Sequence, residues 1–148
     1  MLTRLFIRDF ALIEKAEIEF GDGLNIITGE TGAGKSILLG ALYSILGGPT
    51  SGDLVREGAE RCIVEGLMEF DERSELIKQL QAIDVECEDG QLFLRREILS
   101  NGRSRAYVNG SGSPIKKLRQ IGALLVDLHG QHEHQSLLDP HLHIHYLD

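Results

Sequence analysis

The stretch "GETGAGKS", residues 29–36, constrains the fold of this chain more than any other part of it. It matches the pattern G-x-x-x-x-G-K-[ST], in which a glycine-rich turn between a strand and a helix surrounds phosphate groups. The apolar run "LNIIT" before it predicts a buried strand. The run "KSILLGALYSILGG" after it predicts a helix that begins near Lys35 and ends at Gly47 and Gly48. The flanks therefore agree with the motif.

The residue types of the motif explain why it binds a nucleoside triphosphate. Its glycines let the backbone curl so that successive N–H groups point at phosphate oxygens. The amino-terminal end of the helix adds a partial positive charge to the same site. Lys35 reaches the β- and γ-phosphates, and the Ser36 hydroxyl ligates Mg²⁺. The predicted nucleotide-binding residues are Gly29, Glu30, Thr31, Gly32, Ala33, Gly34, Lys35 and Ser36.

Composition narrows the class of protein. The 148 residues, 42% hydrophobic and 26% charged, are typical of one soluble globular domain. No apolar run approaches the ~20 residues that span a membrane, and we expect no membrane partner and no signal peptide. Cys62 and Cys87 are too few for a disulfide framework, which favours a reducing cytosol. The net charge of −8 argues against a generally basic nucleic-acid-binding surface but allows a local patch.

The remaining pattern mixes strands and helices and predicts an α/β fold. Alternation over residues 4–20 predicts two strands, with Ala16, Ile18 and Phe20 on one side of the second. Further strands are predicted at residues 63–70, 91–98, 105–109 and 123–128, and helices at 73–83, 113–122 and from Asp139 onward. Ser113 is expected to cap its helix, with Pro114 in the first turn.

Hydrolysis of the nucleotide also needs an acid that holds Mg²⁺. Asp127 follows the apolar run "ALLV", where such an acid would lie if that run were a strand. Two interpretations stay open. Either Asp127 completes a compact P-loop kinase or GTPase, or it is an ordinary residue and the acid lies on another segment.

All six histidines lie in the last twenty residues, three of them in "HGQHEHQ", residues 129–135. They are His129, His132, His134, His141, His143 and His145. On a helix the last three do not share a face, because alternate residues are ~200° apart. No cysteine is near, and the spacing is not that of a known zinc motif. A zinc site is therefore the less favoured interpretation, and solvated histidines around a loop are favoured.

Basic residues crowd one predicted hairpin and the helix after it. Arg95, Arg96, Arg103 and Arg105 lie on the hairpin, with Lys116, Lys117 and Arg119 on the helix. One interpretation is a patch that binds DNA phosphates. The other is an edge hairpin whose charges prevent aggregation. Both stay open.

Residues 4–48 resemble the amino-terminal head segment of ABC-type ATPases of the SMC, RecF and RecN group. "LRREILSNGRSRAYVNG" resembles the arginine-rich hairpin of RecF and RecN proteins, and "LVDLHGQHEHQSLLDP" resembles the RecN branch in particular. The resemblance implies the amino-terminal lobe of a P-loop NTPase head over residues 1–138. A mixed sheet would contain the P-loop strand beside an antiparallel β-subdomain. Residues 139–148 would start a coiled-coil helix.

The resemblance also implies a function. The intact protein would be a cytoplasmic ATPase of the bacterial nucleoid that acts in double-strand break repair and recombination. ATP and Mg²⁺ would be sandwiched between the heads of a homodimer, with DNA as a further partner. A carboxy-terminal lobe of the same protein would supply the signature motif and the Mg²⁺-binding acid. The fragment alone would then hydrolyse ATP poorly or not at all.

The same resemblance assigns roles to individual residues. Lys35 and Gln131 would be catalytic, and Gln131 would reach Mg²⁺ together with Ser36. Gln135 is the alternative to Gln131. Arg56 would lie near nucleotide or DNA, or it would be a plain surface arginine. A RecF-like or SMC-type DNA-binding ATPase is the nearest alternative. A module that ATP closes into a dimer, with hydrolysis incidental, is another.

Overall fold

The computed structural model describes residues 2–20, 25–26 and 32–128. Its strands are β1 (Leu2–Phe10), β2 (Ile13–Glu19), β3 (Asn25–Ile26), β4 (Arg61–Glu69), β5 (Gln91–Leu99), β6 (Ser104–Val108) and β7 (Ser111–Ser113). Its helices are α1 (Gly32–Ile45), α2 (Glu75–Ala82) and α3 (Ile115–Leu128), with two single 3₁₀ turns at Gly52–Leu54 and Glu88–Gly90. The predicted α/β class is confirmed.

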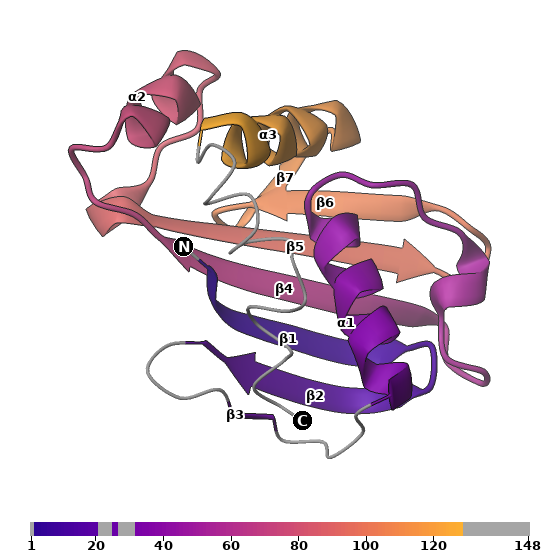
Figure 1. Ribbon diagram of the computed structural model, residues 1–148. Helices are drawn as coiled ribbons and strands as arrows, with labels where there is room; N and C mark the ends of the chain where they lie inside the picture. Colours follow the sequence, from indigo (N-terminus) through magenta and orange to yellow (C-terminus); the bar gives the residue numbers. More distant parts are fainter. Residues whose placement is uncertain (1, 21–24, 27–31, 129–148) are drawn as a thin grey trace.

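The strands form one twisted sheet in the order β3-β2-β1-β4-β5-β6-β7 (Figure 1). Each pairing among the described residues is antiparallel, which differs from the expected mixed sheet. Short turns join β1 to β2, β5 to β6 and β6 to β7, and such turns permit only antiparallel pairing. Helix α1 lies in the connection from β3 to β4. Strand β4 does not pair with β3; it pairs antiparallel with β1.

Alternation along the strands decides which face of the sheet is covered. The buried positions of β4 and β5 lie opposite one another, because Val64 pairs with Arg96 and Met68 with Leu92. Helix α1 packs on this face through Leu42 and Ile45. Ile45 packs directly over Gly66 of β4, since a Cβ at Gly66 would lie only 2.5 Å from Ile45 Cδ1. A glycine in β4 thus lets α1 lie close to the sheet.

Helix α1 ends where the glycines predicted. Gly47 has a left-handed φ of +92°, its N–H donates to Ser44 O at 3.2 Å, and Gly48 N–H donates to Tyr43 O at 2.9 Å. This is the Schellman arrangement, which satisfies carbonyls at the end of a helix. The helix predicted at residues 73–83 is confirmed as α2, and the Ser74 hydroxyl accepts from Ile77 N at its amino-terminal end.

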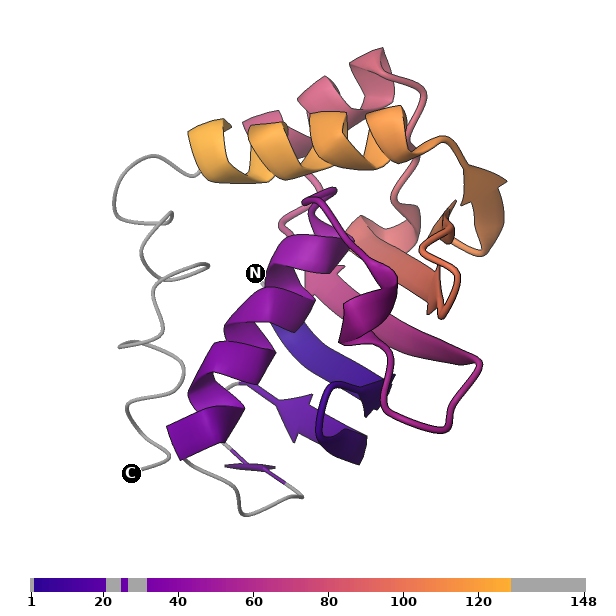
Figure 2. The ribbon, with the colours of Figure 1, turned by 90° about the vertical axis from the view of Figure 1, so that its right-hand side faces the viewer.

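The strand predicted at residues 123–128 is wrong, because these residues belong to α3. Leu118, Ile121 and Leu125 are buried at intervals of three and four residues, which is the period of a helix that buries one face. Helix α3 packs beside α2 and against β6 (Figure 2). The capping prediction is also wrong, since Ser113 belongs to β7 and its hydroxyl donates to Pro114 O.

Helix α3 continues through Gly122, past its predicted end, and packs closely there. A Cβ at this position would overlap the carbonyl oxygen of Leu46 and lie 3.1 Å from Leu46 Cβ, so α3 approaches the end of α1 at Gly122. We expect Gly122→Ala to destabilise the protein by about 1–3 kcal/mol, because overpacking against backbone outweighs the better helix propensity of alanine. Urea unfolding would measure this. Gly112→Ala, where a Cβ meets nothing within 4 Å, is the control and should change stability little. Equal effects at both positions would contradict the close approach.

Among the helices that the structure describes, none has both the length and the apolar character needed to cross a membrane.

Candidate nucleotide-binding site

The phosphate-binding motif coincides with the start of α1. The first five residues of α1 are Gly32, Ala33, Gly34, Lys35 and Ser36, so the helix begins inside the motif and three residues before the predicted Lys35. The side chain of Ser36 is exposed. Strand β3 precedes the motif and pairs with β2. The other three predicted residues, at positions 29–31, lie outside the described residues.

The chemistry of this helix end suits an anion. The first N–H groups of a helix have no partner inside it, and the aligned peptide dipoles place about half a positive charge there. No acidic residue occupies the first turn of α1 to satisfy those groups. A phosphate held at this end would therefore gain hydrogen bonds and a favourable field at once.

The opposite end of α1 is held by Arg96 of β5. Its Nη1 donates to Ser44 O at 2.7 Å and to Gly48 O at 2.9 Å. Its Nη2 donates to Thr50 Oγ1 at 3.2 Å and to Ser104 Oγ at 3.1 Å. The guanidinium thus binds carbonyls at the negative end of the helix dipole, where a cation is stabilising.

Burial of Arg96 corrects its predicted role as a DNA contact. The residue is 3% exposed, so its guanidinium faces the interior and not a ligand in solvent. Burial lowers the pKa of Arg96, and the nearby charge of Arg119 lowers it further. An arginine stays protonated nonetheless, and its Nε has no hydrogen-bond partner among the described residues. A buried cation of this kind is tolerated because four acceptors surround it.

The sequence pattern does contain a signal for the internal role of Arg96, although the charge of the hairpin obscures it. Inward positions of β5 alternate as Leu92, Leu94, Arg96 and Ile98, so the arginine takes a place where the period of two demands an apolar side chain. A cation at such a position needs internal acceptors, and that requirement identifies it as structural.

Arg95 points to the opposite face of the sheet and is also engaged. Its guanidinium pairs with Glu65 at 3.1 Å and with Glu97 at 2.7 Å, and it lies 5.7 Å from the centre of the Tyr107 ring. Glu97 is buried and also pairs with Arg61 at 3.5 Å. These ion pairs neutralise the Arg95 charge within the protein, so Arg95 is a poor candidate for binding DNA phosphates.

Arg103 and Arg105 differ from their two neighbours. Both are exposed, and neither forms an ion pair with another residue of the described segments. Arg119 is exposed as well, and its backbone packs against Gly47. Arg56, by contrast, forms two long ion pairs: its Nη1 lies 3.9 Å from Asp9 Oδ1, and its Nη2 lies 4.0 Å from Glu14 Oε2. The hairpin arginines therefore split into two internal cations and two free ones.

Several predicted site residues lie outside the described residues. They are Gln131, Gln135, His129, His132, His134, His141, His143 and His145. Asp127 is described as a backbone position within α3. Across residues 2–20, 25–26 and 32–128, no group of three or more histidine, cysteine or acidic side chains could hold a metal ion.

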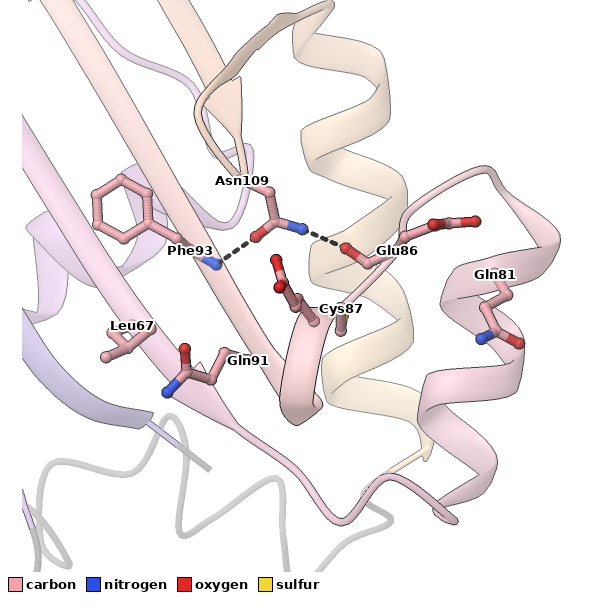
Figure 3. A pocket seen from close by; sticks show the side chains of 8 residues that line it. Leu67, Gln81, Glu86, Cys87, Gln91, Phe93 and Asn109 are labelled. Carbon is pink, nitrogen blue, oxygen red and sulfur yellow. Dashed lines mark hydrogen bonds between the residues drawn. The ribbon is translucent and has the colours of Figure 1, made fainter.

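A hollow of about 580 Å³ opens away from the motif, between the sheet and the loop that follows α2 (Figure 3). Leu67 and Phe93 come from the sheet, and Glu86 and Glu88 from the loop. Asn109 bridges the two, since its Oδ1 accepts from Phe93 N and its Nδ2 donates to Glu86 O. The lining contains carboxylates and no cation, so it would repel phosphate. This hollow is not the nucleotide site.

Comparison with known proteins shows the family of this chain. Residues 4–139 match the family described as AAA domain. The chain belongs to the AAA domain family. It is 42% identical over its whole length to the DNA repair protein RecN of Halalkalibacterium halodurans, of which it covers 26%. The chain thus spans about a quarter of the length of this curated relative. The resemblance to RecN proteins is confirmed.

Solved structures agree on the fold of this AAA domain. An SMC ATPase structure superposes on this chain with a TM-score of 0.63 at 21% identity. It comes from work on the ATP-driven dimerization and DNA-stimulated activation of SMC ATPases. The match covers 83% of this chain and 78% of that one. The recombination mediator protein RecF with ATP gives a TM-score of 0.53 at 21% identity, covering 76% and 27%. The predicted SMC-type head fold is confirmed.

Proposed function

We propose that this AAA domain is the ATP-binding lobe of an SMC-like ATPase that acts in DNA double-strand break repair and recombination. The observation that carries the proposal is that residues 32–36 of the motif form the amino-terminal end of α1, in a fold similar to SMC heads. The repair role rests on the identity with RecN proteins.

In this proposal each part of the motif has a separate task. Backbone N–H groups of residues 29–34 hold the phosphates, Lys35 neutralises the β- and γ-phosphates, and Ser36 ligates Mg²⁺. Gln131 would orient the attacking water or reach Mg²⁺ through its carbonyl oxygen, with Gln135 as its alternative. Mg²⁺ supplies charge neutralisation when it is bound. Two heads would sandwich ATP, and a carboxy-terminal lobe would complete the site.

The rival enzyme, a compact kinase or GTPase, loses its main support. It required Asp127 at the end of a strand, and Asp127 lies within a helix of fourteen residues. The other rival is a module that ATP closes into a dimer without productive turnover. It shares the nucleotide site with the proposed ATPase and differs only in the fate of the bound ATP.

Turnover by the isolated chain separates these proposals. We expect the purified 148-residue chain to bind ATP and to hydrolyse it about 100-fold more slowly than the full-length protein that contains it, because groups that stabilise the transition state would be missing. A phosphate-release assay on both proteins measures this. Fast turnover by the chain alone, abolished by Asp127→Ala, would establish the compact enzyme. A full-length protein without turnover would favour the dimerisation module.

DNA is proposed to bind at the two exposed arginines of the β5–β6 hairpin. We expect the double change Arg103→Ala and Arg105→Ala to lower the slope of log affinity against log salt concentration by about 1.8, the value for two lost phosphate contacts. Fluorescence anisotropy with duplex DNA at several salt concentrations measures the slope. The control removes two other exposed cations, Arg73→Ala with Lys78→Ala on the α2 segment, and should leave the slope unchanged. The edge-strand interpretation predicts no change in either variant.

A further inference from the structure

The guanidinium of Arg96 joins two parts of the molecule that the proposed function treats separately. On one side it binds Ser44 O and Gly48 O at the carboxy-terminal end of α1, and Thr50 just beyond. On the other side it binds the hydroxyl of Ser104, the first residue of β6. Ser104 stands between the exposed Arg103 and Arg105. Two hydrogen bonds in series therefore connect the exposed cations of the hairpin to the end of α1.

This connection is stiff enough to transmit a displacement. The guanidinium is planar and buried, so its donors keep a fixed geometry. Helix α1 has 14 residues and is ~21 Å long at ~1.5 Å per residue, and its backbone hydrogen bonds join its two ends in one continuous series. Its far end carries Gly32, Gly34 and Lys35 of the phosphate-binding motif. A displacement of Ser104 would therefore change the position of α1 and of the phosphate-binding residues at its amino-terminal end.

A second contact also holds the hairpin to the segment that follows α1. The turn after β5 packs on the segment after α1, because Ser100 N donates to Glu60 O at 2.9 Å and a Cβ at Gly52 would overlap Ser100 O. The hairpin and residues 48–60 are thus held together at the turn, while Arg96 holds them at the start of β6. Both contacts lie on the carboxy-terminal side of α1.

We propose that Arg96 and Ser104 are positioning residues that couple DNA bound at Arg103 and Arg105 to the P-loop helix, so that DNA changes the rate of ATP turnover. The inference rests on the proposed function, because it needs ATP at the motif and DNA at the hairpin. Neither Arg96 nor Ser104 touches nucleotide or DNA. Both act through the position of α1.

A pair of matched variants separates coupling from ordinary stabilisation. Ser104→Ala removes the acceptor on the hairpin side, and Thr50→Ala removes the acceptor on the α1 side, both from the same Nη2 and at nearly equal lengths of 3.1 and 3.2 Å. Each variant loses one neutral acceptor, so their stabilities should fall by similar amounts. Only Ser104→Ala removes the hydrogen bond between Arg96 and β6.

The experiment measures ATP turnover by the full-length protein with and without duplex DNA, and the ratio of the two rates. We expect Ser104→Ala to lower this ratio about three- to fivefold relative to wild type, with the Kd values for ATP and for DNA changed less than twofold. Thr50→Ala should keep the wild-type ratio. An unchanged ratio in Ser104→Ala, an equal loss in Thr50→Ala, or a wild-type rate that DNA does not alter would each overturn the proposal. Failure of the proposed function would be recognised separately, as wild-type protein that does not bind ATP or DNA.

Discussion

Arg96→Met is expected to destabilise this protein by about 3–5 kcal/mol, which is more than almost any single surface change costs. The substitution keeps an unbranched chain but removes all four hydrogen bonds of the guanidinium. The half-buried Gly48 carbonyl would lose its Arg96 donor, and the buried Ser44 carbonyl would keep only the Gly47 N–H. A buried acceptor left without its hydrogen bond costs about 1–3 kcal/mol. The negative end of the α1 dipole would also lose its cation. Urea unfolding followed by circular dichroism measures the difference.

Arg105→Met is the matched control, because it makes the same chemical change at an exposed residue of the neighbouring strand. It should alter the free energy of unfolding by no more than about 0.5 kcal/mol. Arg96→Lys should fall between the two, since an ammonium can reach some of the acceptors but cannot form the planar fork. Near-equal stabilities of Arg96→Met and Arg105→Met would refute the clamp on α1.

Lys35→Ala is expected to weaken binding of MgATP about 100-fold or more. A lysine that reaches two phosphates makes charge-assisted hydrogen bonds, and ~3 kcal/mol of lost interaction corresponds to that factor. The helix should still form, because its apolar side chains Leu38, Leu42 and Ile45 pack on the sheet without Lys35. Isothermal titration calorimetry measures the affinity, and thermal unfolding without ligand checks the fold.

The control for Lys35 is Lys78→Ala, which removes an equal charge from the exposed side of α2. Its ATP affinity should match that of wild type within about twofold, because salt screens a distant surface charge. A loss of less than threefold in Lys35→Ala would mean that the motif does not hold the terminal phosphates.

Local patterns predict much of this fold because the decisive interactions are local. The hairpin of β1 and β2 follows from alternation over adjacent residues, which buries Ala16 and Ile18 on the covered face. The end of α1 follows from Gly47, whose positive φ costs a glycine little. Helix α2 follows from the helical pattern of residues 73–83 alone.

Patterns fail where a distant segment decides the outcome. Gly122 has the sequence signal of a helix end, yet α3 continues through it, and the carbonyl of Leu46, 76 residues away in the chain, lies where a Cβ would be. The three-residue β7 is too short to show an alternation, so the pattern around Ser113 predicts a cap instead of a strand. Arg95 and Arg96 are neighbours in sequence, yet the pleat sends one to the ion-pair network and the other into the core.

The central claim is that residues 29–36, of which residues 32–36 begin α1, hold the phosphates of ATP. Backbone amide NMR of the 148-residue chain tests it residue by residue, by titration with Mg²⁺ and a non-hydrolysable ATP analogue. We predict that the largest shift changes fall on the amides of residues 29–36 and that Lys35→Ala removes them. Largest changes around Asn109 and the acidic hollow beside it, or no changes that saturate, would contradict the account.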